Sequence, residues 1–195
     1  YIVTGDNATV TQINNLKRAG NTITATLKIN SSAASTVDTR STDKITIEAN
    51  VGGSSFDSSS GISALNTLKG KTSSPITATV NATKAELTSG ASTSLSTDSS
   101  DILTINIPTN STNTFQFTAG HNDIAVYKKI RTASKSTGVI TAAVSGTKDI
   151  IDSDFKPTSI ATDNVAVEVT NAYAGSEHAT LNGLAAKTIG VVTAT

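Results

Sequence analysis

The sequence predicts an α/β fold, an elongated repeat solenoid of helix–strand units whose strands run parallel. Three observations support this prediction. A β-forming tetrad occurs four times, at residues 23–26, 76–79, 140–143 and 192–195, with spacings of 53, 64 and 52 residues. A helix-like segment precedes each tetrad, and a strand-like run follows each of the first three. Such self-similarity is typical of repeat proteins, whose units stabilise one another by stacking.

The segments before the tetrads predict short helices. Their apolar residues recur three to four positions apart, which gives one narrow apolar stripe. The four segments are residues 11–16, 63–68, 124–130 and 180–184. Acids precede them and bases follow, as the helix macrodipole favours; these residues are Asp6, Asp57, Asp123 and Glu177, then Lys17, Arg18, Lys69, Lys71, Lys128, Lys129, Arg131 and Lys187. We expect the basic side chains to stabilise the helix ends and to stay solvated.

The tetrads and the runs that follow them predict strands. Residues 45–49, 103–107 and 165–169 alternate apolar and polar side chains, which is the strand period. The Ser/Thr/Asp-rich stretches before these runs predict short helical turns. Because helices alternate with strands, parallel pairing is favoured. We therefore expect the first residues of the four tetrads to be buried at equivalent positions of parallel strands; these are Ile23, Ile76, Ile140 and Val192.

The repeats divide the chain into units. Residues 1–5 resemble the tail of a preceding repeat, and three full units and one truncated unit follow, at 6–52, 53–117, 118–172 and 173–195. Neither end resembles a capping repeat, so we expect a segment of a longer array or a protomer completed by its neighbours. The alternative fold is a series of tandem small β-sandwich domains. It would need about seven strands per 100 residues, more than the sequence offers.

Composition excludes several classes of protein. The net charge of +0 removes the basic footprint of a nucleic-acid-binding protein. No apolar run approaches the length of a membrane span. The chain has no cysteine, so disulfides and thiolate metal sites are excluded. Serine and threonine make up about 30% of the residues and aromatics only 4%, a bias that fits proteins made in bulk for export.

The succession of a striped helix, an [Ile/Leu/Val]-Thr-Ala-Thr tetrad, a Ser/Thr/Asp turn and an Asp-led strand resembles the repeats of very large bacterial surface proteins. These include S-layer-like proteins and long secreted adhesins, some of them cyanobacterial. The resemblance covers nearly all of the chain. It implies a structural or adhesive role at the cell surface, outside the cell, often with calcium dependence. It implies no catalytic residues.

An aspartate leads the second strand of each full unit, at Asp43, Asp101 and Asp163. Two roles are open. The side chain could accept downstream amides and fix the turn into the strand. Alternatively, these carboxylates, with acids such as Asp98 or Asp154 and loop carbonyls, could hold calcium between units, since calcium takes six to eight oxygen ligands.

No other motif predicts chemistry. The two histidines, His121 and His178, fall at equivalent positions before helices, too far apart in a solenoid to share one zinc ion. We expect solvated turn histidines and no enzyme activity. The predicted function is a structural extracellular repeat segment of a surface layer, stalk or filament, whose partners are copies of itself or adjacent repeats. The alternative is an adhesin module that presents one face to a glycan or a cell.

Overall fold

The computed structural model describes residues 2–16, 22–88, 101–134, 138–171 and 178–194. The strands are β1 (Ile2–Gly5), β2 (Thr24–Lys28), β3 (Lys44–Glu48), β4 (Phe56–Asp57), β5 (Ile76–Asn81), β6 (Ile102–Asn106), β7 (Phe115–Phe117), β8 (Ile140–Gly146), β9 (Asn164–Val169) and β10 (Val192–Ala194). The helices are α1 (Val10–Leu16), α2 (Ser31–Ala34), α3 (Ser58–Lys69), α4 (Lys84–Thr88), α5 (Asn122–Ser134), α6 (Lys148–Ile150) and α7 (His178–Ala185). Short 3₁₀ turns η1 (Asn7–Thr9) and η3 (Val51–Gly53) and a π-helical turn η4 (Ile151–Phe155) complete the order.

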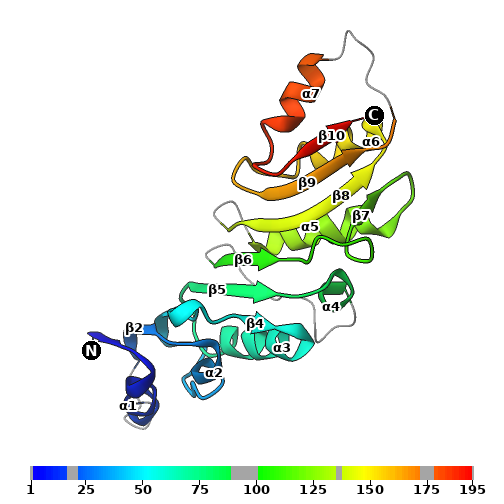
Figure 1. Cartoon of the computed structure of the whole chain (residues 1–195). Coiled ribbons are helices and arrows are strands. Elements are labelled where there is room, and N and C mark those ends of the chain that lie inside the picture. The colour runs from blue at the N-terminus through cyan, green and yellow to red at the C-terminus, as the bar shows by residue number, and fades with distance from the viewer. Residues whose placement is uncertain (1, 17–21, 89–100, 135–137, 172–177, 195) are drawn as a thin grey trace.

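In the described part of the chain, all ten strands belong to one sheet, and every pairing is parallel. Eight of them follow chain order across the sheet, β1-β2-β3-β5-β6-β8-β9-β10, so each connection leads to the next position. The two ends of the chain therefore lie at opposite ends of an elongated molecule (Figure 1). This confirms an α/β fold of alternating strands and helices in one parallel sheet, and it makes the tandem β-sandwich alternative wrong.

Two short strands interrupt the regular succession. β3 pairs with the start of β5, and β4 pairs with the end of the same strand. In the same way, β6 pairs with the start of β8 and β7 pairs with its end. The chain thus leaves the sheet after β3 and again after β6. It rejoins the sheet as β4, just before α3, and as β7, just before α5. Sequence reasoning missed β4 and β7 because strands of two and three residues are too short to show a period.

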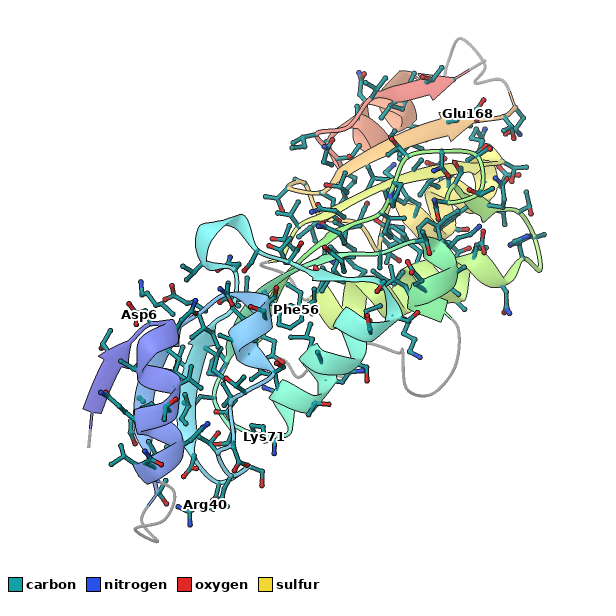
Figure 2. All side chains as sticks on the ribbon, turned by 60° about the horizontal axis from the view of Figure 1, so that its bottom comes forward. Asp6, Arg40, Phe56, Lys71 and Glu168 are labelled. Atoms are coloured by element: carbon teal, nitrogen blue, oxygen red, sulfur yellow. The ribbon has the colours of Figure 1, made fainter. Side chains whose placement is uncertain are left out.

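Among the described residues, the helices pack on one face of the sheet. In β5, buried and half-buried residues alternate until the exposed Asn81, and β2, β3, β6 and β9 show the same two-residue alternation. The buried side chains join those of the helices in one core. A parallel strand order that always advances in one direction puts all crossover helices on the same side when the crossovers share one hand. On the other face the strands present mainly threonine, asparagine and a few charged residues. One of the charged residues is Glu168 on β9, which is labelled in Figure 2.

The expected core positions are largely confirmed. Ile23, Ile76 and Ile140 are 3%, 1% and 0% exposed. Val192 is only half-buried, because β10 comes last in the strand order and pairs with β9 alone among the described residues. The helices predicted before each tetrad and the short helical turns after the first three are also present.

The aromatic side chains are not spread evenly through this core. Phe115, Phe117, Tyr127 and Phe155 pack edge-to-face or tilted, with ring centroids 5.6–6.0 Å apart. All four are fully buried. Elsewhere in the described core only Phe56 is aromatic, and aliphatic side chains fill the space. The region around α5 therefore has a different core from the region around α3.

Candidate functional site

The three aspartates predicted as site residues lie at one edge of the sheet, where the strands begin. Each links two neighbouring strands. Asp43, just before β3, accepts the amide of Ile23 just before β2 (2.9 Å). Asp101 accepts the amide of Ile76 in β5 (2.8 Å), and Asp163 accepts that of Ile140 in β8 (2.9 Å). We call Asp43, Asp101 and Asp163 the strand-linking aspartates; all are at most 1% exposed.

Two of these aspartates also fix the turn that leads into their own strand. Asp43 Oδ2 accepts the amide of Arg40 (2.8 Å), and Asp163 Oδ2 accepts the amide of Ile160 (3.2 Å). The amide comes from three residues upstream, whereas the sequence interpretation expected downstream amides. The larger difference is the bond to the neighbouring strand, which sequence alone does not reveal because the partner lies 20 to 25 residues away.

Each strand-linking aspartate also pairs with a basic side chain. Arg40 approaches Asp43 (3.5 Å), Lys69 approaches Asp101 (2.8 Å), and Arg131 contacts Asp163. The basic side chains are 34%, 14% and 7% exposed in that order. The expectation that helix-end bases stay solvated is therefore wrong for Lys69 and Arg131. They stand at the ends of α3 and α5, but their charges neutralise buried carboxylates.

The pKa of Asp43 reflects this environment. Burial alone would raise it, but the amides of Ile23 and Arg40 and the Arg40 guanidinium favour the carboxylate. Together they hold the pKa of Asp43 below its ordinary value. The carboxylate is thus the stable form of this link.

Two buried threonines provide a second set of links that sequence reasoning missed. Thr72 Oγ1 accepts the amide of Ile45 and donates to the Ile45 carbonyl, which ties the approach to β5 to the start of β3. Thr188 makes the same pair of bonds with Val165 and so ties the approach to β10 to β9. A sequence signal exists: a Lys-Thr pair stands four residues before the tetrads at Ile76 and Val192.

The calcium hypothesis is not tested by these contacts. The Oδ1 atom of each strand-linking aspartate accepts a backbone amide and lies close to a basic nitrogen. Within the part of the chain that the structure describes, no group of three or more His, Asp or Glu side chains is arranged to hold a metal ion. Asp98 lies outside the described residues, and Asp154 instead pairs with Lys128, whose hydrogen bond lowers the pKa of Asp154. His121 is exposed, as expected, and the side chain of His178 lies outside the described part.

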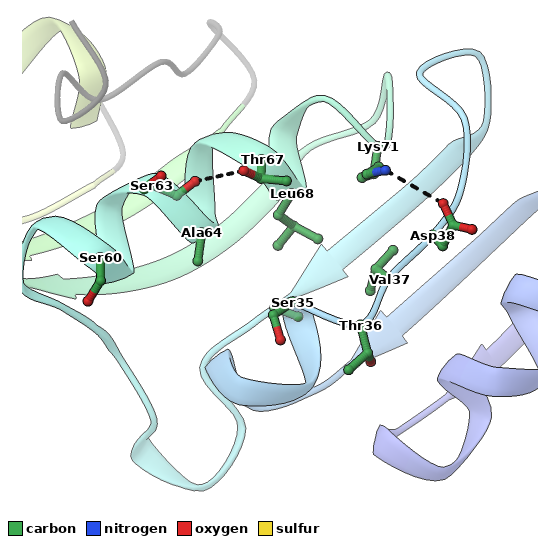
Figure 3. Close-up of a pocket in the computed structure, with 11 residues that line it drawn as sticks. Ser35, Thr36, Val37, Asp38, Ser60, Ser63, Ala64, Thr67, Leu68 and Lys71 are labelled. Carbon is green, nitrogen blue, oxygen red and sulfur yellow. Dashed lines mark hydrogen bonds and ion pairs between the residues drawn. The ribbon is translucent and has the colours of Figure 1, made fainter.

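A groove of about 520 Å³ lies between α2 and α3 on the helix-covered side (Figure 3). Hydroxyl side chains form its rim, apolar side chains form its floor, and an ion pair spans one end. We call it the hydroxyl groove; in that order its residues are Ser35, Thr36, Ser60, Ser63 and Thr67, then Ala34, Val37, Ala64 and Leu68, then Asp38 and Lys71.

The α3 side of the hydroxyl groove follows from helical spacing. Ser60, Ser63 and Thr67 are three and four residues apart, which places them on one helix face. Opposite them, Asn30 caps α2 by accepting the amide of Ala33 (2.8 Å), and this fixes the turn that carries Ser35 and Thr36. A smaller hollow of about 280 Å³ shares Ser35, Ser60 and Ala64 and extends the groove towards Asp57.

Another hollow, of about 470 Å³, lies where β5 and β6 end and the loop before β7 leaves the sheet. Asn81 and Asn106 line it from neighbouring strands. Asn106 Nδ2 donates to Asn81 Oδ1 (2.8 Å), and Asn81 Nδ2 donates to Ser55 Oγ and Asp57 Oδ1. This row of bonds joins β6, β5 and the loop before β4, so it stabilises the point at which the sheet is interrupted.

Comparison with family models, with curated proteins and with solved structures finds no match for this chain. In the described part of the chain, no helix has the length and apolar character required to cross a membrane.

Proposed function

We propose that this chain is a structural repeat segment of an extracellular surface-layer, stalk or filament-forming protein, and that its parallel sheet is one stretch of a solenoid. The observation that carries the proposal is the linkage of adjacent strands by buried side chains. The strand-linking aspartates and Thr72 and Thr188 connect five neighbouring strand pairs. Such nearest-neighbour links suit an extended array, in which each unit contacts only the units beside it.

The proposal includes association with copies of the same chain. β10 pairs with β9 along one edge, and the adjacent Ile189 and Val191 are 71% and 74% exposed. Exposed apolar groups beside a strand favour pairing with another chain. We place the protein at the cell surface because its repeats and its Ser/Thr-rich, cysteine-free composition fit that role.

Sedimentation velocity over a concentration series, with negative-stain microscopy of the most concentrated sample, tests this proposal. We expect ordered polymers or growing oligomers, and we expect Val191→Lys to suppress them. Ile102→Lys is the matched control, because Ile102 is also exposed but lies within the sheet on β6. A chain that stays monomeric throughout, or that responds equally to both substitutions, would contradict the proposal.

A second candidate function is adhesion to a glycan. Notably, five of the seven aromatic side chains are buried, so they offer no exposed platform for a sugar ring; Tyr1 and Tyr173 lie outside the described residues. Among the described residues, polar groups would therefore make the site, and the hydroxyl groove is the observation that favours this function.

A further inference from the structure

The hydroxyl groove has an unusual balance of hydrogen-bonding groups. Three of its hydroxyl groups donate their hydrogen to a backbone carbonyl three or four residues earlier. The bonds are Ser35 Oγ to Ser32 O (2.7 Å), Thr36 Oγ1 to Ala33 O (2.7 Å) and Thr67 Oγ1 to Ser63 O (2.9 Å). Their oxygen lone pairs remain available to a ligand. The rim therefore offers acceptors to an incoming group that can donate.

The charge of the hydroxyl groove is balanced. Asp38 and Lys71 face each other across one end with a separation of 3.6 Å (Figure 3). One carboxylate and one ammonium group leave no net charge there, so neither a polyanion nor a polycation gains from this end of the groove. A neutral ligand rich in hydroxyl donors matches these features.

The floor adds an apolar surface. Ala34, Val37 and Leu68 are at most 4% exposed and close the bottom of the groove, and the half-buried Ala64 is the floor side chain that a ligand can reach. A pyranose ring has hydroxyl groups around its rim and C–H groups on its faces. The floor can contact the C–H face while the serine and threonine oxygens accept from the ring hydroxyls, which is the combination of apolar lining and a few convergent polar groups found in ligand sites.

We propose that the hydroxyl groove binds a short segment of a neutral oligosaccharide. The inference rests on the adhesive function and is independent of self-association. From Ser60 to Leu68 the groove follows about 12 Å of helix, and it continues to Lys71 just beyond the end of α3, so the ligand is a chain of sugars rather than a single ring.

The equivalent interval between α4 and α5 explains why the site is confined to this place. Ser31 and Lys84 are the first residues of α2 and α4, and the amide of each is bound by a side chain of a later loop, Ser54 or Asn113. Lys84 extends to Asp123 at the start of α5 (2.8 Å) and so ties α4 to α5. Ser31 is too short to form such a tie, and the interval between α2 and α3 stays open.

The chain offers a matched pair of threonines for the test. Thr67 on α3 lines the hydroxyl groove, and Thr132 lies on α5; both are exposed, and both donate to the carbonyl four residues earlier. Replacement by valine removes the hydroxyl and keeps the shape, and replacement by arginine fills the space in front of the helix. Any effect on the helix itself should be shared by the two positions.

We would titrate the ¹⁵N-labelled chain with cellotetraose, maltotetraose and chitotetraose, each to about 10 mM, and with tetragalacturonate as a charged probe. We expect saturable shifts of amides in residues 31–38 and 58–71 with at least one neutral probe, and none with the charged one. Thr67→Val should weaken that binding about three- to tenfold, the range for one neutral hydrogen bond. Thr67→Arg should abolish it, and both Thr132 variants should bind like the parent chain.

Three results would overturn the inference: no saturable shifts with any neutral probe, shifts centred elsewhere, or equal losses for the Thr67 and Thr132 variants. The amide spectrum of each variant shows directly whether it is folded. Because sedimentation reports self-association separately, a failure here leaves the assembly proposal intact.

Discussion

In the regions around α3 and α5, a basic side chain near the end of the helix pairs with a strand-linking aspartate. The two regions differ in the packing of the core and in the basic residue. α3 packs with Ile62, Leu65 and Leu68, and its terminal Lys69 reaches Asp101 while 14% of its side chain remains exposed. α5 packs with Tyr127 and Ile130 against an aromatic cluster, and its Arg131 is almost fully enclosed. The fold therefore depends on a link between strands at this position and not on a particular core or cation.

The two regions also differ in how open the space beside the helix is. The groove beside α3 is rimmed with hydroxyls, whereas Lys84 and Asp123 form a partly buried ion pair between α4 and α5. Arg131 Nη2 also donates to Ser134 Oγ and to the carbonyl of Gly138 (2.7 Å each). A side chain at Gly138 would collide with the Leu103 carbonyl, so the chain is closely packed here. The α5 region should accordingly be the more sensitive to loss of a charge.

The largest expected effect is that of Asp163→Ala. It leaves the enclosed Arg131 without its carboxylate, and removal of one partner from a buried ion pair costs about 3–5 kcal/mol. Asp43→Ala should cost less, about 1–3 kcal/mol, because Arg40 is 34% exposed and can be hydrated. Urea unfolding of both variants measures the difference.

A double variant sharpens that comparison. Arg131→Met with Asp163→Leu removes both charges, so it should recover part of the stability lost in Asp163→Ala. Equal losses of unfolding free energy for Asp163→Ala and Asp43→Ala would show that the enclosure of Arg131 does not increase the cost of removing its carboxylate partner.

Much of this fold could be predicted from sequence, because period-two runs and helical stripes are local signals. The tetrad at Ile76 shows its strand without any knowledge of a neighbour. The partner of Asp101 could not be predicted, since choosing between local amides and Ile76 requires the strand register. The hydroxyl groove was hidden for another reason: serine and threonine are so frequent that Ser60, Ser63 and Thr67 do not stand out. Phe115 and Phe117 stand two residues apart in the sequence, but the contact of Phe117 with Phe155 could not be predicted without the fold.

In the aromatic cluster we expect a substitution that stabilises the chain, with a smaller effect than the losses expected for the aspartate variants. The hydroxyl of Tyr127 is buried without a hydrogen-bond partner in the described part of the chain. Burial first, and then the negative charge of Asp163, raise the pKa of Tyr127 well above its ordinary value, so the phenol stays neutral. Tyr127→Phe removes an unsatisfied polar group and should stabilise the chain by about 1 kcal/mol.

Thermal unfolding checks this expectation, with Tyr127→Leu as the control. The leucine variant also removes the hydroxyl, but it loses the ring contacts with Phe115 and Phe117 and should be less stable than the parent. A phenylalanine variant that melts below the parent would mean that the hydroxyl has a favourable partner, such as a water molecule.

Acid should weaken the link that Asp43 forms between β2 and β3, over a defined range of pH. The pKa of Asp43 is lower in the folded chain than its ordinary value of about 3.9. Its charge-dependent stabilisation is therefore fully present above about pH 4, and it is lost as the pH falls through the folded-state value. The difference in unfolding free energy between the parent chain and Asp43→Asn should shrink between pH 5 and low pH. A difference that is the same at both ends of that range would remove the carboxylate charge from the account.

The smallest expected effect is that of calcium, and it tests all three links at once. If the strand-linking aspartates act through amides and basic side chains alone, the thermal midpoint should be the same with excess calcium and with a chelator. The amide and cation contacts already satisfy Asp43 and Asp163, and calcium would need six to eight oxygens around each carboxylate. Calcium bound only to the folded state would instead raise the midpoint as its concentration increases. If such a rise occurred, Asp43→Asn, Asp101→Asn and Asp163→Asn would locate the ion. The variant that loses the calcium response would identify the link at which metal replaces the basic side chain.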